Sequence, residues 1–296
     1  MSSTERSTES PTGPRIVREI RELQRWADGE RASGRRIALV PTMGALHEGH
    51  LSLVRRARAC ADRVVASVFV NPTQFGPGED FDRYPRDLDG DAAKLGRSGC
   101  DVVFAPSADE MYPDGDCTWV EVEGLTDGLC GRDRPGHFRG VTTVVTRLLN
   151  AAKPHIAVFG EKDYQQLVVI RRLVRDLHID VDIVAGPTVR EPDGVAMSSR
   201  NALLERSHRE QACALNAALA EARDLYGAGE RDATRLMSAA RQRVEKEPDA
   251  RVDYVELRCA ETLAPLERID RPAVLALAVR FGATRLIDNT TLAEDR

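Results

Sequence analysis

The sequence has little lysine, no paired cysteine motif and no long apolar run. Only four of its 42 basic residues are lysines, so each lysine stands out as a possible anion ligand. The six cysteines include no Cys-x-x-Cys pair, which excludes the spacing of zinc ribbons and dithiol redox sites. No apolar run is long enough to span a membrane and no signal-peptide pattern opens the chain. We therefore expect a cytoplasmic protein with free thiols and no membrane partner.

The charge balance gives no sign of a nucleic-acid partner. The 296 residues include 42 Lys+Arg and 47 Asp+Glu, a formal net charge of −5. Dedicated DNA and RNA binders usually carry a basic surplus, so we expect none here, although a local basic pocket for a phosphorylated ligand is compatible with this charge. With 42% hydrophobic and 30% charged residues, the composition is that of a folded chain, long enough for one large domain or two ordinary ones.

Hydrophobic periodicity predicts alternating helices and strands. Residues 1–14 are rich in Ser, Thr, Pro and Gly and have no apolar period, so this tail is predicted to be disordered. Cys60 lies in an apolar helical run and Cys100 just before a strand, and both are predicted to be buried thiols. The first helix is predicted to end near Gly29 from an apolar face of Ile16, Ile20, Leu23 and Trp26.

The order of these elements predicts a Rossmann-type α/β fold, a doubly wound parallel sheet with helices on both faces. We assign it to residues 15–188, and assign residues 189–296 to a smaller C-terminal α+β domain. Strands of the first domain are predicted at 36–40, 64–70, 101–104, 155–159 and 181–184, and helices at 49–60, 88–96, 141–152 and 164–177. The second domain is predicted to have helices at 207–226 and 233–247 and strands at 252–257, 274–279 and 284–287.

Candidate ligand-binding residues follow the first predicted strand, where such sheets bind ligands. The segment 41–50 reads Pro-Thr-Met-Gly-Ala-Leu-His-Glu-Gly-His, with two histidines at a helix start that favours anions. Gly49 would allow a nucleotide to approach the backbone, and His47 and His50 could donate to phosphate oxygens. Two ordinary surface histidines, or a zinc pair without an evident third ligand, are the alternatives.

Two later segments offer complementary groups. In Gly-Glu-Lys-Asp-Tyr-Gln-Gln (160–166), Lys162 can neutralise phosphate and Asp163 can bind a hydroxyl, although acids also cap helices. The loop Met-Ser-Ser-Arg-Asn (197–201) supplies hydroxyls and a guanidinium that could close over a triphosphate.

Three further loops carry polar groups. The loop 71–77 presents Gln74, which suits a hydroxyl or carboxylate of a substrate. The charged stretch 80–87 could form a lid or an interface. The segment 132–141 places glycines and basic residues before a helix, where it could bind an anion or simply make the turn.

Taken together, these motifs resemble the pantothenate synthetases, ATP-dependent ligases that join pantoate to β-alanine. The resemblance rests on five motifs in the same order (41–50, 69–77, 134–141, 159–166 and 197–201) and extends from about Ile16 onward. The departures are the N-terminal extension and Arg147, where a lysine is usual. Class I aminoacyl-tRNA synthetases carry elements similar to the first and last motifs, so those two are less specific.

The resemblance implies site residues, co-substrates and an assembly state. It implies a homodimer, with ATP as co-substrate, Mg²⁺ as a cofactor whose ligands are unknown, and a C-terminal domain that closes over the site. Catalytic roles fall on His47, Lys162 and Arg200, with His50 as proton donor. Pantoate and β-alanine contacts are implied for Gln74 and Gln166. ATP contacts are implied for Met43, Gly44, Ala45, Leu46, His47, Glu48, Gly49, His50, Gly160, Glu161, Lys162, Asp163, Val189, Met197, Ser198, Ser199 and Arg200.

The implied chemistry has two steps. Pantoate and ATP form pantoyl-adenylate and pyrophosphate, and the amine of β-alanine then displaces AMP. Three alternatives remain open: a nucleotidyltransferase of the same superfamily, a tRNA-aminoacylating fragment and a non-catalytic nucleotide-binding module. The acidic charge balance and the lack of a basic anticodon domain disfavour the second.

Overall fold

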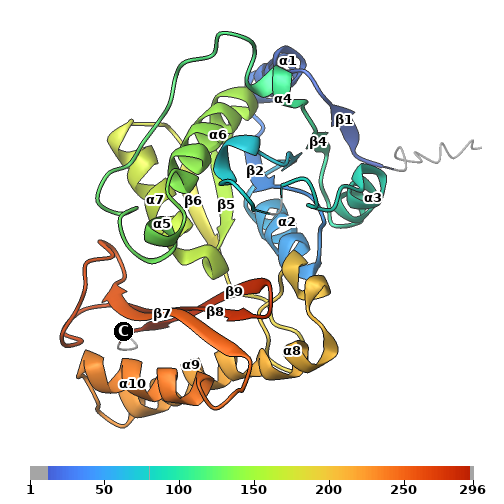
Figure 1. The fold of residues 1–296 in the computed structure, drawn as a ribbon. Helices are drawn as coiled ribbons and strands as arrows, with labels where there is room; N and C mark the ends of the chain where they lie inside the picture. The colour runs from blue at the N-terminus through green and yellow to red at the C-terminus, as the bar shows by residue number, and fades with distance from the viewer. Residues whose placement is uncertain (1–12, 80, 294–296) are drawn as a thin grey trace, which may run out of the picture.

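A parallel and an antiparallel sheet organise the molecule. The structure, a computed structural model, describes residues 13–79 and 81–293, so the predicted disordered tail lies almost entirely outside the described residues. A six-stranded parallel sheet has the order β1-β4-β3-β2-β5-β6, and a three-stranded antiparallel sheet has the order β7-β8-β9. Figure 1 shows the second sheet below the first. The predicted fold class, a Rossmann-type sheet with a smaller α+β part, is confirmed.

The strands of the parallel sheet alternate their side chains between two cores. In β2, Ile37 and Leu39 join one apolar cluster, whereas Ala38 and Val40 join the other. Strands buried on both faces read as continuous apolar runs, which is why most of them were visible in the sequence. The strands are β1 (Arg15–Val17), β2 (Ile37–Thr42), β3 (Arg63–Val68), β4 (Val102–Phe104), β5 (Ile156–Gly160) and β6 (Asp182–Gly186).

Helices cover both faces of this sheet. Buried residues of α1, α6 and α7 form one cluster with the strands, and those of α2 and α3 form the other. α6 begins four residues before the predicted start at 141. The helices and short 3₁₀ turns are α1 (Ile20–Ala32), α2 (Glu48–Cys60), η1 (Pro72–Gln74), α3 (Leu88–Arg97), α4 (Ala108–Met111), α5 (Leu129–Asp133), α6 (His137–Ala152), η2 (Glu161–Asp163) and α7 (Tyr164–Asp176).

Two sequence predictions in this region are wrong. Ile16 lies in the edge strand β1, paired in parallel with Val103 of β4, and not in the first helix. Its spacing from Ile20 matches a helical face by coincidence, because a three-residue strand is too short to show its own alternation. Cys60 is exposed, because the buried face of α2 is made by Leu53, Val54 and Ala57. Cys100 is buried, as predicted.

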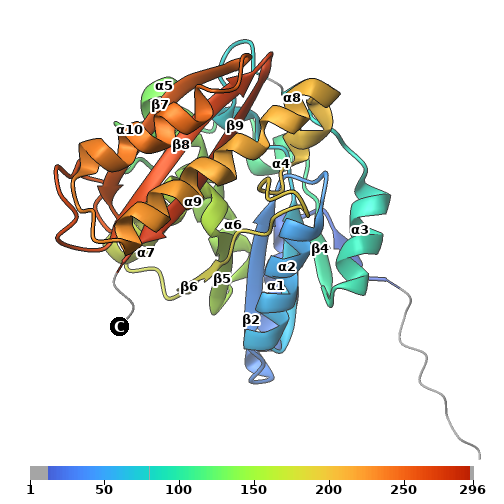
Figure 2. The same cartoon turned by 90° about the horizontal axis from the view of Figure 1, so that it is seen from below.

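The antiparallel sheet has its own helical layer. Figure 2 shows α9 and α10 lying across one face of the sheet. The predicted single helix 207–226 is interrupted near the buried Ala212, and α8 and α9 are separate. The elements are η3 (Ser199–Leu203), α8 (Arg206–Gln211), α9 (Cys213–Gly227), α10 (Ala233–Val244), β7 (Ala250–Cys259), β8 (Ala273–Phe281) and β9 (Thr284–Leu292).

The opposite face of the second sheet is turned toward the first part of the chain. Leu129 of α5 packs with Tyr254 and Ala276, and Val168 of α7 packs with Val274. These contacts bring residues of both parts to a common cleft. Within residues 13–79 and 81–293, no helix has the length and apolar character needed to cross a membrane.

Candidate active site

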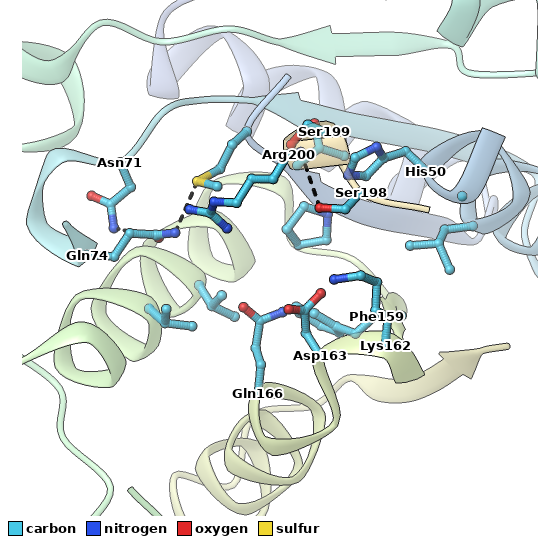
Figure 3. A pocket seen from close by; sticks show the side chains of 18 of the residues that line it. His50, Asn71, Gln74, Phe159, Lys162, Asp163, Gln166, Ser198, Ser199 and Arg200 are labelled. Carbon is cyan, nitrogen blue, oxygen red and sulfur yellow. Dashed lines mark hydrogen bonds between the residues drawn. The ribbon is translucent and has the colours of Figure 1, made fainter. Parts of the chain in front are cut away.

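A cavity of about 240 Å³ opens beside the carboxyl ends of β2 and β5. These strands are neighbours, yet the helices that follow them, α2 and α7, pack on opposite faces of the sheet. The order of the strands therefore reverses between β2 and β5, which is where doubly wound sheets bind ligands. Figure 3 shows side chains from several segments arranged around this space.

Most of the predicted site residues line the cavity, although they come from four separate stretches of the chain. The segment after β2 contributes its two histidines, and η1 contributes Gln74. The segment after β5 supplies Lys162 and Asp163, and the start of η3 supplies Arg200. The predicted residues on the lining are Met43, His47, Gly49, His50, Gln74, Gly160, Lys162, Asp163, Gln166, Val189, Met197, Ser198, Ser199 and Arg200.

Five residues of the predicted ATP segments lie outside this lining: Gly44, Ala45, Leu46, Glu48 and Glu161. Leu46 belongs to the apolar core under the loop, and the carboxylate of Glu48 pairs with Arg55 on the surface. The first motif thus divides into residues that face the cavity and residues that hold the turn.

The turn before α2 is held by a buried carboxylate. Asp91 of α3 is 1% exposed, and its oxygens accept hydrogen bonds from the backbone N–H groups of Ala45 (2.8 Å) and Leu46 (2.9 Å). Gly44 (φ 86°) and Ala45 (φ 52°) are both left-handed, so a glycine is favoured at 44. Asp91 was not singled out in the sequence, although an acid between the apolar positions of an amphipathic helix was a usable signal.

The two histidines form one unit at the start of α2. The backbone N–H of His47 donates to Nδ1 of His50 across 3.4 Å, and the ring centroids are 4.1 Å apart. A Cβ on Gly49 would lie 2.9 Å from Cε1 of His47, so this glycine makes room for the His47 ring. The sequence had suggested that it makes room for a nucleotide.

Burial keeps both rings neutral near pH 7. It lowers the pKa of His50 to about 3, assisted by His47, and the pKa of His47 to about 4, assisted by the Lys162 ammonium. Nδ1 of His47 is buried and meets no hydrogen-bond partner among the described residues. The pair therefore offers neutral ring nitrogens to a ligand, and not fixed positive charge.

Gln74 is oriented by its neighbours. Its Nε2 donates to Sδ of Met43 (3.0 Å), and its Oε1 accepts from Nδ2 of Asn71 (3.1 Å). Asn71 is itself buried, donates to the carbonyl of Gly140 and accepts from the Tyr112 hydroxyl at 2.8 Å. Asn71 also lines the cavity, and sequence reasoning quoted its loop without assigning it a role.

Arg134, just before α6, and His137, its first residue, contact η1 and the loop that follows it. The guanidinium of Arg134 forms a two-pronged pair with Glu79, at 2.8 and 2.6 Å. His137 lies 2.8 Å from the carbonyl of Gln74, and burial with the nearby Arg134 lowers the pKa of His137 to about 4. Of the two alternatives for this segment, the pair with Glu79 supports the turn, although both Arg134 and His137 reach the cavity lining.

The start of η3 and the two residues before it line the cavity. Ser198 caps η3 by accepting from the N–H of Arg200, and the Ser199 hydroxyl lies 3.3 Å from that of Tyr84. Tyr84 belongs to the charged stretch that the sequence left open as lid or interface. Its contact with Ser199 favours the lid.

A larger cleft of about 520 Å³ continues from this site between the two sheets. It shares Lys162, Gln166 and Arg200 with the first cavity and adds residues of β8 and β9. The arrangement can therefore hold an extended ligand with a phosphorylated part at the histidines and further groups toward the cleft.

Known proteins match the chain over almost its whole length. The family described as Pantoate-beta-alanine ligase matches residues 15–291. The pantothenate synthetases of Pelotomaculum thermopropionicum and Geobacter sulfurreducens are each 53% identical to the chain. The alignments cover 94% and 95% of this chain and 99% and 100% of those proteins.

Solved structures agree in fold. Pantothenate synthetase from Thermus thermophilus has a TM-score of 0.87 at 49% identity, covering 93% of this chain and 98% of that one. The pantoate-beta-alanine ligase of Francisella tularensis, complexed with β-γ ATP and β-alanine, has a TM-score of 0.77 at 34% identity, covering 94% and 97%. The chain belongs to the pantoate–β-alanine ligase family.

Proposed function

We propose that this chain condenses (R)-pantoate with β-alanine in two steps. The pantoate carboxylate attacks the α-phosphorus of ATP, which forms pantoyl-adenylate and releases pyrophosphate. The amine of β-alanine then attacks the acyl carbon, and AMP leaves. The observation that carries this proposal is that two neutral amides, Gln74 and Gln166, line the same cavity as His50, Lys162 and Arg200.

The basic groups are assigned to the adenylation step. Negative charge gathers on the α-phosphate and the departing pyrophosphate, and donors placed beforehand stabilise it most as it develops. We assign His50 as the main donor, supported by His47, and assign charge neutralisation to Lys162 and Arg200. Because the histidines are neutral, their part is hydrogen bonding through N–H, whereas the two cations supply the charge.

The amides and loops are assigned to the substrates. Gln74 and Gln166 suit the hydroxyl and carboxylate groups of pantoate and β-alanine, because a neutral amide both donates and accepts. Gly160 to Asp163, Val189 and Met197 to Arg200 are assigned to ATP. The turn Gly44–Leu46 supports its neighbours Met43 and His47, which face the ligand.

Mg²⁺ fits this site as an ion carried mainly by the nucleotide. Within residues 13–79 and 81–293, no three His, Cys, Asp or Glu side chains converge to hold a metal, and Asp163 is the single carboxylate on the described lining. Mg²⁺ typically binds substrate phosphates together with one or two carboxylates and keeps several waters. Asp163 would hold the ion, which when bound neutralises phosphate charge.

We further propose the domain division at 188/189, with the C-terminal domain as a lid that shelters the acyl-adenylate from water. The family resemblance supports a homodimer in the cytoplasm. Light scattering on the purified chain tests the dimer.

Pyrophosphate exchange tests the proposed reaction. Labelled pyrophosphate should enter ATP only when pantoate is present, and β-alanine should not be required. Exchange that is equal without pantoate would refute the assignment and favour a nucleotidyltransferase or a simpler nucleotide-binding role.

A further inference from the structure

The last strand of the second sheet contacts the segment that carries Lys162. Asn289, in β9, is 9% exposed. Its Nδ2 donates to two consecutive backbone carbonyls, those of Glu161 (3.0 Å) and Lys162 (2.9 Å). Both carbonyls belong to η2, so one amide from the second sheet holds the turn from which Lys162 and Asp163 reach the cavity in Figure 3.

The preceding residue on β9 fixes the other nucleotide segment. Asp288 is 2% exposed and forms a two-pronged ion pair with Arg190, at 2.7 and 3.0 Å. Arg190 follows Val189 on the cavity lining, and its Nη1 also donates to the carbonyl of Gly194 at 3.1 Å. One oxygen of Asp288 also accepts from the backbone N–H of Asn289 (2.8 Å).

Two adjacent residues of β9 thus contact both segments, 160–163 and 189–194, and each segment contributes residues to the cavity lining. Asp288 and Asn289 are not what holds β9 in the second domain. Leu286 and Leu292 do so, because they pack in one apolar cluster with α9 and α10. A buried amide adds little to such a core unless its polar atoms are paired, and the donor atom of Asn289 pairs with η2.

We propose that Asn289 is a positioning residue that acts through Lys162. Its two hydrogen bonds fix the carbonyls of η2, and these set the direction in which the Lys162 side chain leaves the backbone. An ammonium displaced from the developing charge stabilises the transition state less, and small misplacements are enough to slow a reaction strongly. This inference rests on the proposed function, because it assigns Asn289 to the adenylation step.

A double-mutant cycle with Lys162 tests the role. We expect Asn289→Ala to slow single-turnover formation of pantoyl-adenylate roughly 10- to 100-fold in a protein that still folds, with a melting temperature lowered by the two lost hydrogen bonds. In a Lys162→Ala background, the same change should slow the step less than about 2-fold, because the group being positioned is gone. Thr291→Ala, exposed on the same strand, is the matched control and should equal wild type.

The outcomes separate the two hypotheses. A wild-type rate in Asn289→Ala, or equal losses with and without Lys162, would overturn the positioning role. If the wild-type protein shows no pantoate-dependent pyrophosphate exchange, both this inference and the proposed function are wrong. If it does show that exchange but the effects of the Asn289 and Lys162 substitutions are additive, this inference alone is wrong. If Asn289→Ala does not fold, Asn289→Ser, which keeps a donor in a smaller volume, takes its place in the same cycle.

Discussion

The backbone N–H of His47 donates to Nδ1 of His50, so a neutral His50 ring carries its proton on Nε2. Because burial lowers the pKa of His50 to about 3, we expect this tautomer to persist from pH 5 to 8. Long-range ¹⁵N–¹H correlation spectra of the free protein should show a protonated Nε2 and an unprotonated Nδ1 over that range. Titration of His50 between pH 6 and 7 would contradict the arrangement.

The same shifts predict how stability depends on pH. His47, His50 and His137 have folded-state pKa values of about 4, 3 and 4, below the ordinary value of 6.5. Between pH 4 and 6.5, the unfolded chain binds more protons than the folded protein does. The stabilisation from the neutral histidines is therefore complete above pH 6.5 and is lost as the pH falls toward 4. Urea denaturation should show this loss, and His137→Gln should reduce its slope between pH 4 and 6.5. An unchanged slope in that variant would refute the assignment for His137.

Replacement of His50 should separate the two half-reactions. We expect His50→Ala to lower pantoyl-adenylate formation by roughly 10²- to 10⁴-fold, the scale for one positioned donor. The second step should change much less, because pyrophosphate has already left. Rapid-quench assays should compare adenylation with the reaction of prepared pantoyl-adenylate and β-alanine.

The exposed His178, which has a positive φ of 51°, supplies a control for that comparison. His178→Asn should leave both half-reactions unchanged, since asparagine tolerates this backbone conformation. Equal losses of both half-reactions in a folded His50→Ala protein would mean that His50 positions the adenylate generally and has no specific role in adenylation.

Asp91 should matter for stability and for the position of the histidines. Asp91→Asn keeps the shape but presents an amide N–H₂ to one of the two backbone donors at Ala45 and Leu46. We expect a loss of about 2–4 kcal/mol in the free energy of unfolding, since charge-assisted hydrogen bonds are lost and a buried donor is left unpaired. Denaturant titration gives this value, and the exposed Asp89→Asn, in the same helix, should lose less than about 1 kcal/mol. Equal effects of the two changes would contradict this account.

Two helical glycines should respond in opposite ways to alanine. A Cβ on Gly140 of α6 would lie 2.4 Å from the carbonyl oxygen of Thr73, so the η1 backbone that carries Gln74 must move. Gly140→Ala should destabilise the fold by about 1–3 kcal/mol and raise the KM for pantoate. Gly29→Ala in α1, where a Cβ meets nothing within 4 Å, should stabilise it by about 0.5–1 kcal/mol. If both changes stabilise the protein, the η1 backbone can move away from a Cβ at position 140 without cost, and the prediction for Gly140 is wrong.

Thiol reactivity should follow exposure. The six cysteines are free in the structure, and Cys60 and Cys117 are exposed. A disulfide reagent should modify these two rapidly in native protein without loss of activity. Cys100 should react only after unfolding, because burial raises its pKa to about 12. An intramolecular disulfide in denatured, non-reduced protein would overturn the prediction of six free thiols.

The sequence predicted an element correctly where its apolar pattern was regular and long enough to be recognised. The β2 strand was recognised because four consecutive residues, Ile37 to Val40, are buried on two faces. The β1 strand was missed because three edge residues carry no readable alternation, and its partner β4 is distant in sequence. The break between α8 and α9 was missed because apolar spacing continues through the buried Ala212, whose φ of −60° and ψ of −20° remain close to helical.

For the site, the motifs identified most of the residues that line the cavity but not those that support them. Asp91 and Asn289 act through backbone atoms of residues far along the chain. Such contacts follow from three-dimensional packing and leave no fixed spacing in sequence. The motif alone also could not show that Gly49 accommodates the ring of His47.

The position of β2 between β3 and β5 has a consequence for the order of assembly during translation. Its register with β3 joins Ile37 to Arg63, a short separation, whereas its other edge pairs Ala38 with Ile156. A chain made from its N-terminus therefore carries β2 with one open edge until β5 emerges, and open strand edges invite wrong pairing. β5 ends at Gly160, immediately before the turn that carries Lys162. The strand that protects this edge is thus the one that brings the second cavity-lining segment beside the first.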